Sequence, residues 1–193
     1  GEACGLEFVQ QGLEAGQSAV YIRFVQWPYI YQCTGVLVAN SSGAPRPYLL
    51  TAHHCVSTEE AARSLEAVWF FESESCGSPP SSRSSFLTTS GARLLVTRDR
   101  PQGDFSLLEL AALPARPVRF AGWSTEELDS GREVAVIHHP LNSYKRIAFG
   151  YRVGDEPGPA GRPADLFYTI EYSAGRTDYG SSGAPLFYRQ NGE

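Results

Sequence analysis

Three short stretches of the chain hold the side-chain types needed for nucleophilic catalysis. His54 lies in the run TAHHCV, Asp104 begins the run DFSLLEL, and Ser182 lies in the glycine-rich run YGSSGAP. A histidine can act as a general base, an aspartate can orient its ring, and a serine becomes a good nucleophile when such a base removes its proton. Each stretch alone is also typical of a strand end or a turn, so the hypothesis depends on the three together.

The order of the three residues along the chain narrows the possible folds. An α/β-hydrolase runs serine, acid, histidine, and its Gly-x-Ser-x-Gly elbow is broken here because Ala184 takes the place of the last glycine. The order histidine, aspartate, serine is instead that of chymotrypsin. An esterase of unrelated fold therefore stays open only as an alternative that the residue order and Ala184 disfavour.

The segments around these residues mostly show the sequence patterns of β-strands. Short apolar or alternating runs separated by turn residues predict a sandwich or a pair of barrels, and only residues 58–65 carry a helix start signal. Residues 77–90 and 154–163 are rich in Ser, Pro and Gly, and we interpret both as surface loops. A connector at 114–117 divides the strands into two halves. The predicted strands are 19–26, 34–39, 48–51, 67–71, 92–96, 105–110, 118–121, 133–138, 146–152, 166–172 and 184–188.

Four cysteines favour disulfides over a metal site. Their spacing matches no zinc-ligand pattern, and an even count in a chain without Met indicates a processed protein of an oxidising compartment, secreted, periplasmic or at the cell surface. Cys33 and Cys55 end two strand-like runs joined by a turn-rich stretch, so a hairpin brings them together. The pairing of Cys4 and Cys76 stays open.

Charge and hydropathy limit the partners. The net charge is −5 with no basic stripe, so we expect no nucleic-acid partner. No apolar run approaches the length of a membrane span, so we expect no membrane insertion. Nothing in the sequence indicates a metal or a cofactor.

Seven runs of the chain together follow a known family pattern. They are CTGVLV (33–38), LLTAHHC (49–55), DFSLLEL (104–110), FAGW (120–123), VIHHP (136–140), KRI (145–147) and GSSGAPLF (180–187). In these runs the chain resembles the trypsin/chymotrypsin-like serine proteases, and among them most closely the bacterial lysyl endopeptidases. The double histidine before the cysteine, the second pair His138 and His139, and Ser181 in place of an aspartate before the nucleophile match that branch. We expect His53, His138 and His139 to be structural.

The resemblance implies a fold and a set of roles. The fold would be two antiparallel six-stranded β-barrels, with residues 1–113 in the first barrel and residues 114–193 in the second. His54 would be the base, Asp104 its orienting partner and Ser182 the nucleophile, with the backbone N–H groups of Gly180 and Ser182 facing the oxyanion. No cofactor is implied, and the substrate would be a protein or a peptide.

Resemblance also raises an expectation about completeness. Family members carry further strands after the nucleophile, so we expect the last strands of the second barrel to be missing from this chain. Either a second chain supplies them, which we favour, or the segment is absent. The N-terminal Gly1–Ala3 does not match the Ile-Val-Gly-Gly type, so we expect no activation through a buried N-terminal ion pair.

Specificity stays open on the sequence alone. Asp178 matches an acidic pocket residue of the lysyl endopeptidases and would favour a Lys or Arg side chain before the cleaved bond. Arg176 would favour an acidic residue such as Glu, or simply neutralise Asp178. We favour a basic preference. An inactive protease-like binding protein is a further alternative.

Overall fold

The computed structural model describes residues 14–42, 45–73, 86–99, 103–154 and 167–188. The predictions for Cys4, Cys76 and Gly1–Ala3, and for residues 77–85 and 155–163 of the two loops, lie outside these ranges. None of the helices in them is long and apolar enough to cross a membrane. The elements are β1 (Ala19–Gln26), β2 (Tyr29–Leu37), β3 (Tyr48–Thr51), α2 (Glu59–Arg63), β4 (Glu66–Trp69), β5 (Leu87–Ser90), β6 (Ala92–Arg98), β7 (Phe105–Leu110), β8 (Glu133–His138), the 3-10 turn η3 (Pro140–Asn142), β9 (Arg146–Val153), β10 (Thr169–Ala174) and β11 (Leu186–Phe187).

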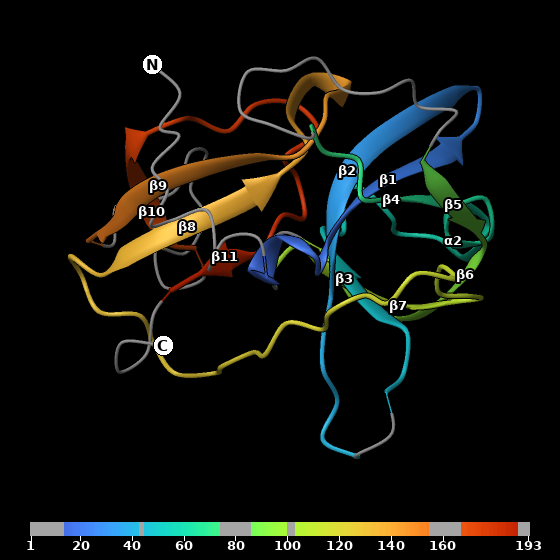
Figure 1. The fold of residues 1–193 in the computed structure, drawn as a ribbon, viewed down its shortest axis with the longest axis horizontal. Coiled ribbons are helices and arrows are strands. Elements are labelled where there is room, and N and C mark those ends of the chain that lie inside the picture. Colours follow the sequence, from blue (N-terminus) through green and yellow to red (C-terminus); the bar gives the residue numbers. More distant parts are fainter. Residues whose placement is uncertain (1–13, 43–44, 74–85, 100–102, 155–166, 189–193) are drawn as a thin grey trace.

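The described strands form two antiparallel sheets, with β1 to β7 in the first and β8 to β11 in the second. The first has the order β5-β4-β1-β2-β3-β7-β6, and the second has the order β10-β9-β8-β11. Figure 1 shows the strands of the first sheet curling together on one side of the molecule, with the second sheet beside them. The all-β class predicted from the sequence is confirmed, while the domain bounds at residues 113 and 114 remain a prediction.

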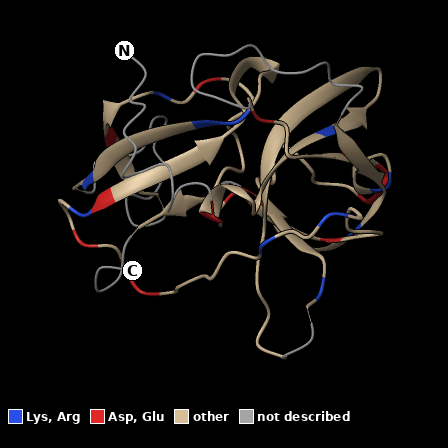
Figure 2. Cartoon of the chain, in the orientation of Figure 1, with Lys and Arg blue, Asp and Glu red and all other residues tan. Residues whose placement is uncertain are grey.

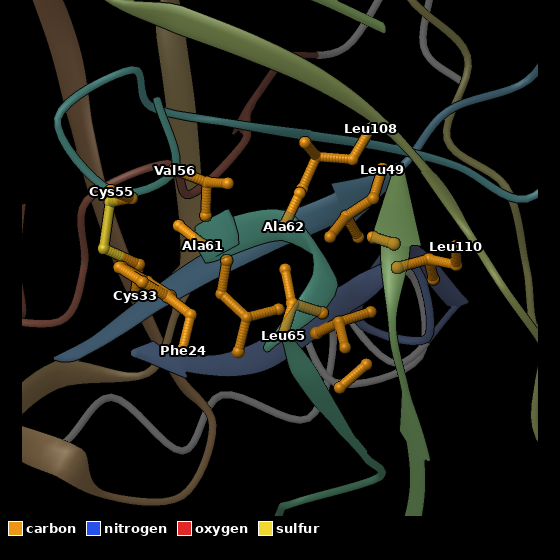
Figure 3. Close-up of a cluster of buried hydrophobic side chains, with 14 of the residues drawn as sticks. Phe24, Cys33, Leu49, Cys55, Val56, Ala61, Ala62, Leu65, Leu108 and Leu110 are labelled. Carbon is orange, nitrogen blue, oxygen red and sulfur yellow. A yellow bond between two sulfur atoms is a disulfide. The ribbon is translucent and has the colours of Figure 1, made fainter. Parts of the chain in front are cut away.

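One apolar cluster fills the first sheet (Figure 3). Alternation along β7 places Leu108 and Leu110 inside, which is the period-two burial expected of a strand with one buried face. Helix α2 closes the cluster with Ala61 and Ala62, and the hydroxyl of Thr58 caps it by accepting the N–H of Ala61 at 3.2 Å. The core therefore fixes the end of β3 and the start of β7, next to which His54 and Asp104 lie.

The predicted disulfide is confirmed at the border of this cluster. Cys33 of β2 and Cys55, four residues beyond the end of β3, are bonded (Figure 3). Both cysteines are buried. Because His54 directly precedes Cys55, the bond ties its backbone to the middle of β2.

Two predictions about strands are wrong, and a third has the wrong bounds, because β2 begins at Tyr29 rather than at residue 34. Residues 87–90 form strand β5 instead of belonging to a loop, because they pair with β4 along their length and Thr89 Oγ1 accepts the Trp69 indole N–H at 2.9 Å. Residues 118–121 form no strand, and only a single bridge joins Ala121 to Val38. The polar composition of β5 concealed its strand, whereas the apolar run at 118–121 packs against the core without a partner ladder.

Charges of both signs are scattered over the elements, with neither sign gathered on one element in the view of Figure 2. Several lie in short-range pairs, such as Glu109 with both Arg46 and Arg93. These pairs hold the pKa of Glu109 below its usual value, chiefly through the hydrogen bond from Arg93. The Arg46 and Arg93 side chains are 50% and 63% exposed, and ion pairs open to solvent in this way contribute little to stability.

Candidate active site

His54 and Asp104 meet through two hydrogen bonds. The imidazole Nδ1 lies 2.8 Å from Asp104 Oδ2, and the backbone N–H of His54 donates to Oδ1 at 3.0 Å. An ionised carboxylate can only accept, so this contact assigns the proton to Nδ1 and leaves Nε2 as the basic nitrogen. With 37% of the His54 side chain exposed, the ring is accessible to a substrate. The pair can therefore work as an oriented general base.

Asp104 is held in a backbone conformation that few side chains adopt. Its φ is 50°, and it follows Gly103 at φ 119° at the start of β7. Asp is among the few residues that enter the left-handed region at modest cost, and strained positions of this kind cluster at functional sites. The turn directs the carboxylate away from the β7 ladder and toward His54.

His53 faces a different set of partners. Its Nδ1 lies 2.8 Å from Thr97 Oγ1, and Thr97 Oγ1 lies 2.6 Å from Ser106 Oγ. Ser106 in turn donates to the Val56 carbonyl at 2.6 Å. The two adjacent histidines thus have different partners. His54 contacts Asp104, whereas His53 links this turn to β6 and β7.

The loop that carries Ser182 docks on the first sheet. The backbone N–H of Thr34 donates to the Ser182 carbonyl at 2.9 Å, and the Thr34 hydroxyl donates to the Gly180 carbonyl at 2.9 Å. Gly183, at φ 79°, approaches so closely that an added Cβ would lie 2.2 Å from Thr51 Oγ1 and 2.3 Å from the Thr34 carbonyl. Only glycine fits there. The loop is therefore seated on the residues next to Cys33 and on the turn that leads to His54.

Two backbone N–H groups of this loop are available to a ligand. In the described part of the chain, the N–H groups of Gly180 and Ser182 donate to no other group. The loop is folded by bonds that use other groups, from Ser181 N to the Asp178 carbonyl and from Ala184 N to the Ser181 carbonyl, both 3.0 Å. Such a pair of fixed donors is suited to a developing oxyanion.

Thr34 is a functional neighbour that the sequence reasoning missed. The residue is fully buried, and besides its bond to Gly180 its hydroxyl accepts the His139 N–H at 3.0 Å. The available signal was a hydroxyl residue directly after Cys33 within an apolar run. This sequence feature does not by itself identify the loop around Ser182 as the partner of the Thr34 hydroxyl.

The second histidine pair is buried, as a packing role requires. Each of the two residues is 1% exposed. His139 stacks on Phe71, with ring centroids 5.8 Å apart, and meets Tyr21 edge to face. Burial keeps the pKa of His139 well below its usual value. His138 differs from the expectation in one respect, because its Nδ1 lies 2.7 Å from Ser181 Oγ, beside Ser182.

The two candidate specificity residues lie in the segment that leads to Ser182. The Arg176 guanidinium is 4.0 Å from the Asp178 carboxylate, with the Arg side chain 81% exposed and the Asp side chain 30% exposed. Asp178 Oδ1 also accepts the Tyr179 N–H at 2.8 Å. Asp178 is therefore partly engaged by its own segment. Within the described ranges, no group of three or more His, Cys, Asp or Glu side chains is placed to hold a metal.

Solved structures with a similar fold are proteases or protease paralogues. Deg5 superimposes with a TM-score of 0.62 at 15% identity, covering 97% of this chain and 83% of that one. An HtrA-type protease with a tripeptide gives 0.62 at 16% identity over 94% of this chain and 50% of that one. An inactivated protease paralogue of the scabies mite gives 0.60 at 14% identity, covering 91% and 79%. At these identities the likeness establishes the fold alone.

Sequence comparison is more specific. A lysyl endopeptidase of Pseudomonas aeruginosa is 33% identical over 121 residues, which are 62% of this chain and 26% of that protein, so the chain spans about a quarter of this relative's length. Residues 3–193 match the family model of the lysyl endopeptidase C-terminal domain. The chain therefore belongs to the lysyl endopeptidase family of chymotrypsin-like serine proteases.

Proposed function

We propose that the protein is an endopeptidase in which Ser182, His54 and Asp104 cleave peptide bonds through an acyl-enzyme. The observation that carries the proposal is the two-point contact between His54 and Asp104, which leaves Nε2 as a base. Ser182 Oγ would attack the substrate carbonyl while its proton passes to His54 Nε2. The same proton would then go to the leaving amine, and water would release the acyl group by the reverse steps.

Charge that develops on the carbonyl oxygen would be stabilised by the N–H groups of Gly180 and Ser182. Support comes from the absence of any other acceptor for these donors among the described residues. Donors fixed before the reaction need no reorganisation as the charge forms, and losing one such donor costs about 10²- to 10³-fold in kcat.

For specificity we propose cleavage after a basic residue, Lys or Arg. The family membership and the 30% exposed Asp178 carboxylate support this preference. Arg176 supports the opposite preference for Glu, but its guanidinium lies near Asp178 and most of its length is in solvent. A peptide series that differs only in Lys, Arg, Glu or Ala before the cut measures kcat/KM for each. A Glu peptide cleaved faster than the Lys peptide would refute the basic preference.

Labelling with a fluorophosphonate tests the proposed activity. The reagent should add its mass at Ser182, and the variants Ser182→Ala and His54→Gln should stay unlabelled. His53→Gln is the matched control, because His53 bonds Thr97 rather than Asp104 and should leave labelling within a few-fold of wild type. Folded wild-type protein that neither labels nor cleaves peptides would instead favour an inactive protease-like binding protein.

We also propose an extracytoplasmic location, secreted, periplasmic or at the cell surface, supported by the Cys33–Cys55 disulfide because such bonds persist in oxidising compartments. Fractionation of the producing cells tests the location. A second chain that completes the second barrel remains a prediction. Intact mass with and without reductant would reveal a disulfide-linked fragment.

A further inference from the structure

One buried side-chain contact joins the second sheet to the residue before Ser182. His138 is the last residue of β8, and its Nδ1 lies 2.7 Å from Ser181 Oγ. The same hydroxyl accepts the backbone N–H of Asp178 at 3.0 Å. Ser181 is 9% exposed and His138 is 1% exposed, so both ends of the contact are shielded from water.

The ring of His138 has one hydrogen-bond partner among the described residues, Ser181. Its Nε2 is buried and makes no hydrogen bond within the described part of the chain. Burial, with a smaller contribution from the Arg146 guanidinium, lowers the pKa of His138 to about 4. The ring is therefore neutral at neutral pH, and the contact with Ser181 is the polar interaction of the described structure that compensates for burying it.

The contact lies next to the proposed nucleophile, where a small displacement would change the reaction rate. Ser181 and Ser182 share a planar peptide unit, and this unit carries one of the two N–H groups that face the oxyanion in the proposed function. Rotation of Ser181 therefore moves that donor and the Ser182 Cα together. Displacements of about 1 Å in a catalytic group can cost about 100-fold in rate.

We propose that His138 is a positioning residue that acts through Ser181 to hold the Ser182 nucleophile and the Ser182 N–H in their reactive orientation. This inference rests on the proposed function. It assigns to Ser181 and His138 together the task of fixing the loop from the second sheet, while Thr34 fixes it from the first.

Two substitutions at His138 separate positioning from bulk. Asn places a polar δ atom where Nδ1 lies, whereas Leu fills a similar volume without one. In the full protein, with the peptide cleaved best by wild type, His138→Leu should lower kcat by about 10- to 100-fold with KM changed less than about threefold. His138→Asn should recover most of that loss.

Control variants distinguish positioning from general destabilisation. Val134→Ala, in the same strand and 4% exposed, removes buried apolar volume four residues before His138 and should keep the wild-type kcat. If His138→Leu does not fold, Ser181→Ala tests the contact from the loop side and should lower kcat in the same way, with Ser181→Thr recovering it. In a folded double variant, the effects of His138→Leu and Ser181→Ala should not add.

The results that overturn the inference differ from those that overturn the function. Wild-type protein that neither labels with fluorophosphonate nor cleaves peptide removes the proposed function. Wild-type protein that cleaves, beside a folded His138→Leu or Ser181→Ala variant with unchanged kcat, removes the positioning role alone. Equal losses in the Leu and Asn variants would likewise reduce His138 to a packing residue.

Discussion

Replacing Asp104 by Asn tests how the carboxylate works, because the change removes charge but almost no volume. In the native contact both oxygens accept, one from the His54 backbone N–H at 3.0 Å and the other from Nδ1 at 2.8 Å. An amide has one acceptor and one donor. If its oxygen stays on the backbone N–H, its NH₂ faces Nδ1, which then has to accept, and the ring proton moves to Nε2.

That tautomer has no base to offer Ser182. The equivalent change in chymotrypsin-like proteases lowers kcat by about 10⁴, or about 5.5 kcal/mol of transition-state stabilisation, and we expect a loss of this size here. KM should change little, because the substrate does not contact Asp104 in the proposed mechanism. Steady-state hydrolysis of a peptide at neutral pH measures both constants.

The matched control is Asp129→Asn, which makes the same chemical change at a side chain 85% exposed and 3.8 Å from Arg132. It should leave kcat unchanged. A folded Asp104→Asn variant that retains more than a tenth of the wild-type kcat would refute the tautomer argument. So would a loss confined to KM.

Three further predictions concern stability. Because the folded-state pKa of His138 lies below its usual value, at about 4, the unfolded chain binds more protons between about pH 4 and 6.5. The free energy of unfolding should therefore fall as the pH is lowered from about 6.5 to about 4, and His138→Asn should flatten this dependence in urea titrations. Gly183→Ala should lower the free energy of unfolding by about 2–5 kcal/mol, because the added Cβ would overlap Thr51 Oγ1. Gly131→Ala is its control, since Gly131 has a φ of 80° with open space around it, and should cost about 1–2 kcal/mol. Equal unfolding midpoints for the two variants would contradict this. Removing the Cys33–Cys55 bond by a double Ser substitution should cost about 3 kcal/mol in denaturant unfolding, given its separation of 22 residues, and an unchanged midpoint would show that the bond constrains little.

Sequence reasoning succeeded for strands whose pattern is complete within the strand itself. The runs at Ala19–Gln26, Tyr48–Thr51, Phe105–Leu110 and Glu133–His138 were predicted with the bounds that the structure has. It failed at Leu87–Ser90, whose polar residues become a strand only because β4 pairs with them. Periodicity reports which face of a strand is buried, and an exposed edge strand carries little of that signal.

The candidate site, too, was predicted from the sequence only in part. Resemblance and residue order predicted that His54 pairs with Asp104, and the structure brings the two side chains together. Thr34 and the contact between His138 and Ser181 were missed, because a hydroxyl or a buried imidazole has no sequence signature for its partner. Both depend on how the loop around Ser182 meets two different sheets.

The buried hydroxyl of Thr34 has a mechanical consequence. By sequence, Ser182 lies among the strands of the second sheet, yet its carbonyl and that of Gly180 are bonded to β2 of the first. The same β2 is joined through Cys33 to the residue after His54. The proposed base and the proposed nucleophile are therefore both tied to β2, so a displacement of the second sheet would have to break these bonds before it changed the spacing between the two residues.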